Sequence, residues 1–122
     1  KEYRRQRQMC IRDSGYQCVW RMFADSDARP PEAVICADDM IALGAMIALQ
    51  TLGIRVPDDV RVVGYDDSPL ALTTMPTLTS VRPPFLQIVT EALRLIGQGP
   101  DQAAHISLLP QLIVRGSTVV RS

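Results

Sequence analysis

Lysine and histidine are almost missing from this chain of 122 residues. Lys1 is the only lysine among 13 basic side chains, and His105 is the only histidine. A magnesium pocket for phosphoryl transfer needs a cation to hold the phosphoryl group, ordinarily a lysine, so the deficit opposes that enzyme class. His105 lies in a polar stretch far from any acidic pair and is interpreted as a solvated loop residue.

Motifs for covalent catalysis and phosphate binding are missing as well. The chain has no Gly-x-Ser-x-Gly elbow and no glycine-rich phosphate loop. Its three cysteines, Cys10, Cys18 and Cys36, are odd in number and lack metal-ligand spacing. We therefore expect no enzyme activity, no metal and no cofactor. Unpaired thiols favour a reducing, cytoplasmic compartment over a disulfide framework.

Charge excess and long apolar runs are also lacking. The formal net charge is zero, which argues against this chain gripping nucleic acid by itself, because that affinity comes mostly from phosphate neutralisation. No apolar run approaches the ~20 residues needed to span a bilayer. We therefore predict no membrane partner.

Two acidic pairs are the most informative feature that is present. Each pair, Asp38-Asp39 and Asp66-Asp67, directly follows a short apolar segment of strand character. In an open parallel sheet, ligands bind just past the carboxyl ends of the strands. Asp38 and Asp66 are therefore the predicted ligand acceptors of a polar pocket. Either Asp38 or Asp39 is predicted to cap the following helix, and Asp39 is favoured.

The order of predicted elements indicates the fold class. A helix starting at Ser14, with an apolar face formed by Tyr16, Val19, Trp20 and Phe23, precedes alternating strands and helices. Such alternation predicts an α/β domain with a mainly parallel sheet. Residues 1–13 are polar and aperiodic, so we expect a non-native or disordered segment ahead of a domain over 14–122. Strands are predicted at 33–36, 60–65, 78–81, 106–109 and 112–114, helices at 39–52 and 85–96, and a short helix at 69–73.

The helix over residues 40–52 is apolar nearly all the way round. A surface helix needs one apolar stripe, so this helix must bury two faces. One face packs on the sheet, and the other needs either another part of the domain or a second subunit. Gly44 and the alanines permit close helix approach, and the sequence leaves both neighbours open.

Five linked motifs resemble the lactose/galactose-repressor family of bacterial transcriptional regulators. They follow one another from about Ser14 to Thr118 without an obvious gap. The motifs are residues 38–46, 52–60, 63–67, 76–83 and 109–118.

The resemblance implies a sensor of the type I periplasmic-binding-protein-like fold. In that fold two α/β lobes surround an effector cleft and are joined by crossovers, and this chain holds an incomplete part of it. The implied ligand contacts are Asp38, Asp66, Arg82 and Pro83, although the family often has asparagine where Asp38 stands. Asp38 keeps an acceptor there but loses the amide donor. The implied dimer contacts are Ala42, Leu43 and Met46 on an exposed face of the helix over residues 40–52, together with Leu70 and Thr74 in the loop near 70–74.

The implied partners are a sugar or small-metabolite effector, a second copy of the chain, and operator DNA. DNA would be bound only through an N-terminal helix-turn-helix that this sequence does not contain. Two alternatives remain from other functional classes. One is a periplasmic sugar-binding protein of a transport system, which has the same fold, and the other is a magnesium-dependent enzyme.

Overall fold

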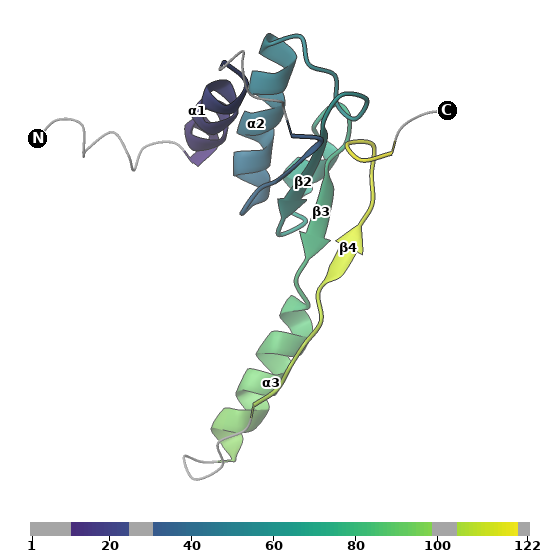
Figure 1. Ribbon diagram of the computed structural model, residues 1–122. Helices are drawn as coiled ribbons and strands as arrows, with labels where there is room; N and C mark the ends of the chain where they lie inside the picture. Colours follow the sequence, from purple (N-terminus) through teal and green to yellow (C-terminus); the bar gives the residue numbers. More distant parts are fainter. Residues whose placement is uncertain (1–10, 25–30, 99–104, 120–122) are drawn as a thin grey trace, which may run out of the picture.

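The computed structural model describes residues 11–24, 31–98 and 105–119. Figure 1 shows a lobe of helices and strands from which one helix projects. The elements in chain order are α1 (Ile11–Ala24), β1 (Ala33–Ile35), α2 (Asp39–Thr51), β2 (Arg61–Tyr65), the 3-10 helix η3 (Pro69–Leu72), β3 (Thr79–Arg82), α3 (Phe85–Gly97) and β4 (Gln111–Ile113).

The four strands form one sheet in the order β1-β2-β3-β4. β1 pairs with β2 in parallel, β2 pairs with β3 in parallel, and β4 runs antiparallel to β3. The predicted α/β class with a mainly parallel sheet is therefore confirmed. Because β1, β2 and β3 share one direction, their carboxyl ends lie at the same edge of the sheet.

Helix α2 lies between α1 and the sheet, and its alanines and leucines fill the core. Ala42, Ala48 and Leu49 have 0% of their surface exposed. The close approach comes from α1, because a Cβ atom on Gly15 would lie 2.0 Å from the backbone oxygen of Ile41. The second neighbour of α2 is thus another part of the same domain.

This packing corrects the expected exposed face of α2. Ala42 is fully buried and Met46 is only 6% exposed, so the expectation that they lie on an open helix face is wrong. The residues on the outer face are Met40 and Ile47, which are 45% and 38% exposed, with half-buried Leu43 between them. Helix α1 packs closely against α2 at Ile41, and Ala42 and Met46 are covered by the chain itself.

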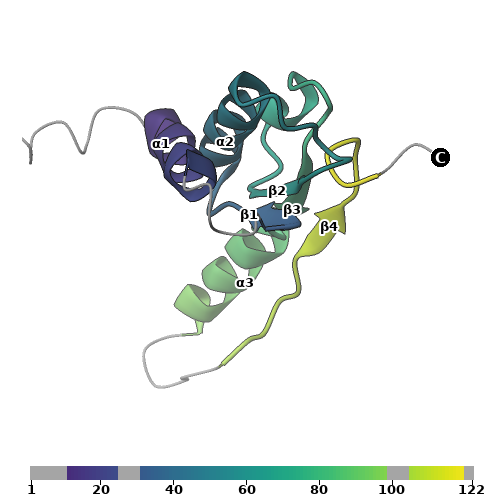
Figure 2. The same cartoon turned by 45° about the horizontal axis from the view of Figure 1, so that its top comes forward.

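Helix α3 differs from the rest, since it projects beyond the carboxyl edge of the sheet in both ribbon views (Figures 1 and 2). None of its residues is buried. The chain then returns through residues 105–110 and enters β4. The predicted strand at 106–109 is wrong, because a strand needs a hydrogen-bonding neighbour and these residues have none among the described residues.

The other predicted elements are confirmed, with small shifts at their ends. The expected short helix is η3, and the expected strand at 112–114 is β4 at Gln111–Ile113. Helix α1 begins at Ile11, so Ser14 lies inside it and does not cap it. Of the segment expected to be non-native, residues 1–10 lie outside the described residues.

Candidate functional site at the carboxyl edge of the sheet

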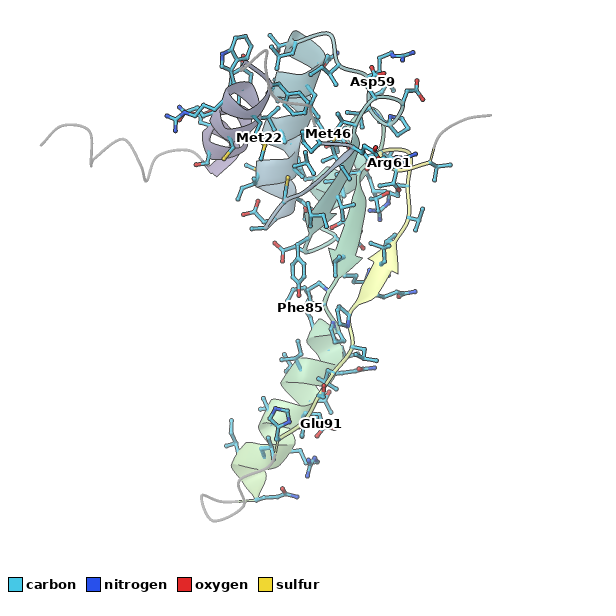
Figure 3. The ribbon with its side chains drawn as sticks, in the orientation of Figure 1. Met22, Met46, Asp59, Arg61, Phe85 and Glu91 are labelled. Atoms are coloured by element: carbon cyan, nitrogen blue, oxygen red, sulfur yellow. The ribbon has the colours of Figure 1, made fainter. Side chains whose placement is uncertain are left out.

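Three parallel strands deliver polar side chains to one edge of the sheet. Past the ends of β1 and β2 come Asp38 and Asp66, and β3 ends at Arg82. Backbone bonds continue to the strand ends, since Cys36 N donates to Val63 O at 2.8 Å and Asp66 N donates to Val81 O at 2.9 Å. Figure 3 shows Phe85, the first residue of α3, beyond this edge and Asp59 at the opposite end of the lobe.

Asp38 is the N-cap of α2. Its backbone is extended (φ −152°, ψ 172°), and its Oδ1 accepts a hydrogen bond from Ile41 N at 2.6 Å. The expectation that Asp39 caps this helix is therefore wrong, because Asp39 is already the first helical residue. Among the described residues, the second carboxylate oxygen of Asp38 has no hydrogen-bond partner, so the cap leaves an acceptor at the edge.

Asp39 is instead a buried anchor for the loop that follows β2. It is 2% exposed and accepts hydrogen bonds from Ser68 N at 2.7 Å, Ser68 Oγ at 2.9 Å and Ser80 Oγ at 2.6 Å. A buried carboxylate is tolerated when hydrogen bonds replace its lost water. Gly64 leaves room for it, because a Cβ atom there would lie 2.3 Å from Asp39 Oδ1.

Asp66 and Asp67 form an unusual turn at the end of β2. Both have positive φ angles, 99° and 48°, a region that side-chain-bearing residues rarely adopt and that costs about 1–3 kcal/mol per residue. Asp67 N donates to Ser80 Oγ at 3.0 Å, which holds the turn. Asp66 is exposed, and within the described residues its carboxylate accepts no hydrogen bond, so it is available to a ligand.

Asp67 is enclosed by two arginines. Its side chain is 5% exposed, Arg82 Nε donates to its Oδ2 at 2.6 Å, and Arg115 Nη2 donates to its Oδ1 at 2.6 Å. Burial acts to raise the pKa of Asp67, but hydrogen bonds from Arg115 and Arg82 outweigh it and hold this pKa below its usual value. The carboxylate is therefore ionised and committed to the arginines.

The other two expected ligand contacts are partly occupied by the protein itself. Arg82 binds Asp67, although 52% of its side chain remains exposed at the edge. Pro83 is buried, and its carbonyl accepts a hydrogen bond from Phe85 N at 2.9 Å. The structure thus brings Asp38, Asp66, Arg82 and Pro83 to one edge, where Asp66 and Arg82 are exposed.

Sequence reasoning missed the supporting residues Asp67, Ser80 and Arg115. Asp67 directly follows Asp66, and Arg115 lies in the family-like motif at 109–118. Nothing in the sequence indicated that these two side chains contact each other. Arg115 also donates from Nη1 to Leu78 O at 2.8 Å. Contacts between positions this far apart follow from the pairing of β3 with β4, which the sequence does not display.

The described residues also form hollows away from the expected ligand contacts. Two adjoining hollows, of about 820 Å³ and 410 Å³, share Val56, Asp58, Met75 and Pro76 at the opposite end of the strands. Thr74 lines the larger hollow, is 8% exposed and donates from Oγ1 to Ala71 O at 3.3 Å. The expected dimer residue Leu70 is half-buried in η3, shortly before Thr74.

Among the residues that the structure describes, neither a reactive thiol nor a metal cluster contributes to the edge. Burial, with smaller effects from Asp38 and Cys18, raises the pKa of Cys36 to about 11. No group of three or more His, Cys, Asp or Glu side chains in the described part of the chain has metal-site geometry. Among the same residues, no helix has both the length and the apolar character to cross a membrane.

Comparison with known proteins agrees with this architecture. Residues 2–118 match the family model of the periplasmic binding protein-like domain. The transcriptional regulator MalR of Streptomyces coelicolor is 49% identical over 90 residues, which is 70% of this chain and 26% of MalR.

Solved structures give the same result. A LacI-type transcription regulator from Bifidobacterium animalis superimposes with a TM-score of 0.76 at 39% identity, covering 89% of this chain and 40% of that one. A complex of the transcriptional regulator CelR with cellobiose gives 0.75 at 34% identity, covering 87% and 33%. The chain therefore spans about a quarter to two fifths of the proteins that it resembles.

Proposed function

Because this chain belongs to the lactose/galactose-repressor family of transcriptional regulators, we propose that it is the effector-sensing part of such a regulator. In this proposal residues 14–122 form part of a sensor domain that has no enzyme activity. The domain binds a sugar or another small metabolite at the carboxyl edge of its sheet.

The exposed carboxylate of Asp66 carries this proposal. It stands at the end of the central parallel pair, where open α/β sheets bind ligands. Its backbone is held at φ 99° although the residue is not glycine, and such strain is maintained mainly at functional sites. A carboxylate accepts charge-assisted hydrogen bonds, and sugar hydroxyls are suitable donors.

The remaining acceptor of Asp38 supports a ligand with several hydroxyl groups. Carboxylate oxygens such as those of Asp38 and Asp66 are hydrogen-bond acceptors, so the matching ligand presents donors to both. The relative CelR was solved with cellobiose, which has such hydroxyls. A sugar is therefore the first class to test.

The proposal also includes regulatory partners, which membership of the family supports. Operator DNA is bound by a part of the regulator outside this chain, and the effector acts by favouring one arrangement of the lobes over another. Two copies pair in the cytoplasm through the outer face of α2 at Leu43 and through η3 at Leu70. Exposed Met40 and Ile47 extend that apolar face, whereas buried Ala42, Met46 and Thr74 support it from within.

Ligand-detected NMR on the chain tests the sugar proposal, because saturation transfer registers weak binding by a single lobe. Glucose, cellobiose and sucrose are titrated against wild type, Asp66→Ala and the control Asp58→Ala, whose exposed aspartate lies at the opposite end of the strands. We expect at least one sugar to bind. Asp66→Ala should weaken binding about tenfold or more, the effect of losing a hydrogen bond to a charged group.

Two results would count against the proposal. Equal sugar signals for wild type and Asp66→Ala would move the binding site away from the carboxyl edge. The absence of any signal in wild type, with circular dichroism showing a folded chain, would exclude these sugars as effectors of the lobe.

A further inference from the structure

Two segments that connect the lobe to α3 are tied to the same carboxylate. Arg82 ends β3 and leads through Pro83 and Pro84 into α3, whereas Arg115 follows β4, the strand that returns from beyond α3. Both guanidinium groups bind Asp67, at sequence separations of 15 and 48 residues. The outgoing and returning segments are thus fastened at a single point on the lobe.

The backbone on either side of this point is also fastened. Asp66 N donates to Val81 O at 2.9 Å, and Asp67 N donates to Ser80 Oγ at 3.0 Å. Ser80 Oγ in turn donates to the buried Asp39 at 2.6 Å. The peptide unit between Asp66 and Asp67 therefore cannot shift without disturbing β3, and the carboxylate of Asp66 is directed by that peptide unit.

A second arginine–aspartate pair shows what is special about this arrangement. Arg55 and Asp59 are joined at 2.7 Å and 2.9 Å, but both are exposed and lie four residues apart in one loop. That pair can stabilise only its own turn. Asp67 joins three segments that are distant in the sequence, and it does so with a nearly buried side chain.

We infer that Asp67 is a positioning residue, which holds the outgoing and returning connections of the lobe against the turn that presents Asp66. The inference rests on the proposed function only for the ligand role of Asp66. Its consequence is that a ligand bound to Asp66 and the direction of the two connections influence each other through Asp67. Substitution of Asp67 should therefore increase local opening of the backbone at the carboxyl edge of the sheet without increasing it in the core helix α2.

Amide hydrogen exchange on the whole chain, followed by NMR, tests this inference without any ligand. The variants are Asp67→Asn, Arg82→Gln and Arg115→Gln, with Asp59→Asn as the matched control. We expect Asp67→Asn to accelerate exchange about tenfold or more at Asp66, Asp67 and Arg115, whose amide donates to Thr79 Oγ1 at 2.7 Å. Amides in the middle of α2 should keep their wild-type rates, and Asp59→Asn should change none of these.

Each other outcome would overturn the positioning role. Unchanged exchange at Asp66 and Arg115 would show that Asp67 holds nothing in place. Equal acceleration in α2 and at the edge would show a general stabilising role instead. Combining Asp67→Asn with Arg82→Gln should add little to Asp67→Asn alone, and additive effects would contradict a shared attachment point.

A titration with cellobiose separates this inference from the proposed function. If wild type binds cellobiose, Asp67→Asn should weaken binding about tenfold although Asp66 is intact, and Asp59→Asn should not. An unchanged affinity for Asp67→Asn would contradict the coupling to Asp66. If wild type binds none of the sugars, these sugars are excluded as effectors of the lobe, and the exchange rates still decide whether Asp67 positions the two connections.

Discussion

Helices α2 and α3 have the same length, 13 residues, yet they have opposite surroundings. Seven residues of α2 are buried between α1 and the sheet, whereas none of α3 is buried. The apolar face of α3 is open, with Leu86 at 81%, Leu93 at 65% and Ile96 at 77% exposure. The amphipathic pattern therefore establishes a helix and its apolar face, but not whether the chain itself covers that face.

The buried helix α2 and the projecting helix α3 should differ most in the free energy of unfolding that is lost when a leucine is truncated. Leu49→Ala in α2 removes a side chain with 0% exposure and should lower the free energy of unfolding by about 3 kcal/mol. Leu93→Ala in α3 removes one that is 65% exposed and should change it by less than about 0.5 kcal/mol. Urea denaturation followed by circular dichroism measures both. A loss of similar size for Leu93→Ala would mean that α3 is packed in solution.

Glycine substitutions sharpen the same comparison. Gly15→Ala places a Cβ atom 2.0 Å from the backbone oxygen of Ile41, so α1 must move from α2, at a cost of about 1–3 kcal/mol. A Cβ atom on Gly97, at the end of α3, meets nothing within 4 Å. Gly97→Ala should therefore stabilise the chain slightly, by up to about 1 kcal/mol. Thermal unfolding that ranks the two variants in the other order would contradict the described helix contact.

The stability that the Asp67 contacts with Arg82 and Arg115 contribute should depend on pH. The folded-state pKa of Asp67 is held low, so its stabilisation is complete above the unfolded value of about 3.9 and is lost as pH falls through the folded value. Asp67→Asn should lower the free energy of unfolding by about 2 kcal/mol at pH 7. The difference in this free energy between variant and wild type should begin to shrink only below about pH 4 and should vanish at lower pH. Urea unfolding of both proteins between pH 2 and 7 measures it.

The exposed Arg55–Asp59 pair is the control for the contacts of Asp67 with Arg82 and Arg115. Its interaction lowers the pKa of Asp59 to about 2, but solvent and salt screen exposed charges. In 1 M salt the effect of Asp59→Asn on stability should vanish, whereas most of the effect of Asp67→Asn should remain. Equal salt sensitivity would show that Asp67 is more open to solvent than its 5% exposure indicates.

The last prediction concerns the reaction rates of two thiols and involves no change in stability. Cys36 is buried with a pKa of about 11, whereas Cys18 is exposed. At pH 8 roughly one Cys36 thiol in a thousand is ionised. Iodoacetamide should therefore modify Cys18 well before Cys36, as peptide mass spectrometry would show. Equal rates would reveal frequent opening between α1 and the sheet.

Sequence reasoning reached the fold class and the edge that carries the candidate site. The apolar runs before Asp38 and Asp66 are strands whose carboxyl ends lie together, because neighbouring strands in such a sheet are parallel. It favoured Asp39 over Asp38 as the cap of α2, although Asp38 makes it, because two adjacent aspartates satisfy the same local rule. The strand at 106–109 was wrong because an apolar run does not reveal whether a neighbouring strand exists.

What the sequence determined by itself was local: the periodicity of each helix and strand, the acidic residues after β1 and β2, and the family-like motifs. Only the tertiary structure decided which face of α2 meets α1, that Asp39 is buried beneath Ser68 and Ser80, and that Arg82 and Arg115 share Asp67. The physical reason is the separation in sequence between the residues that make contact. Periodicity and capping involve residues a few positions apart, whereas these contacts join residues from 15 to 48 positions apart.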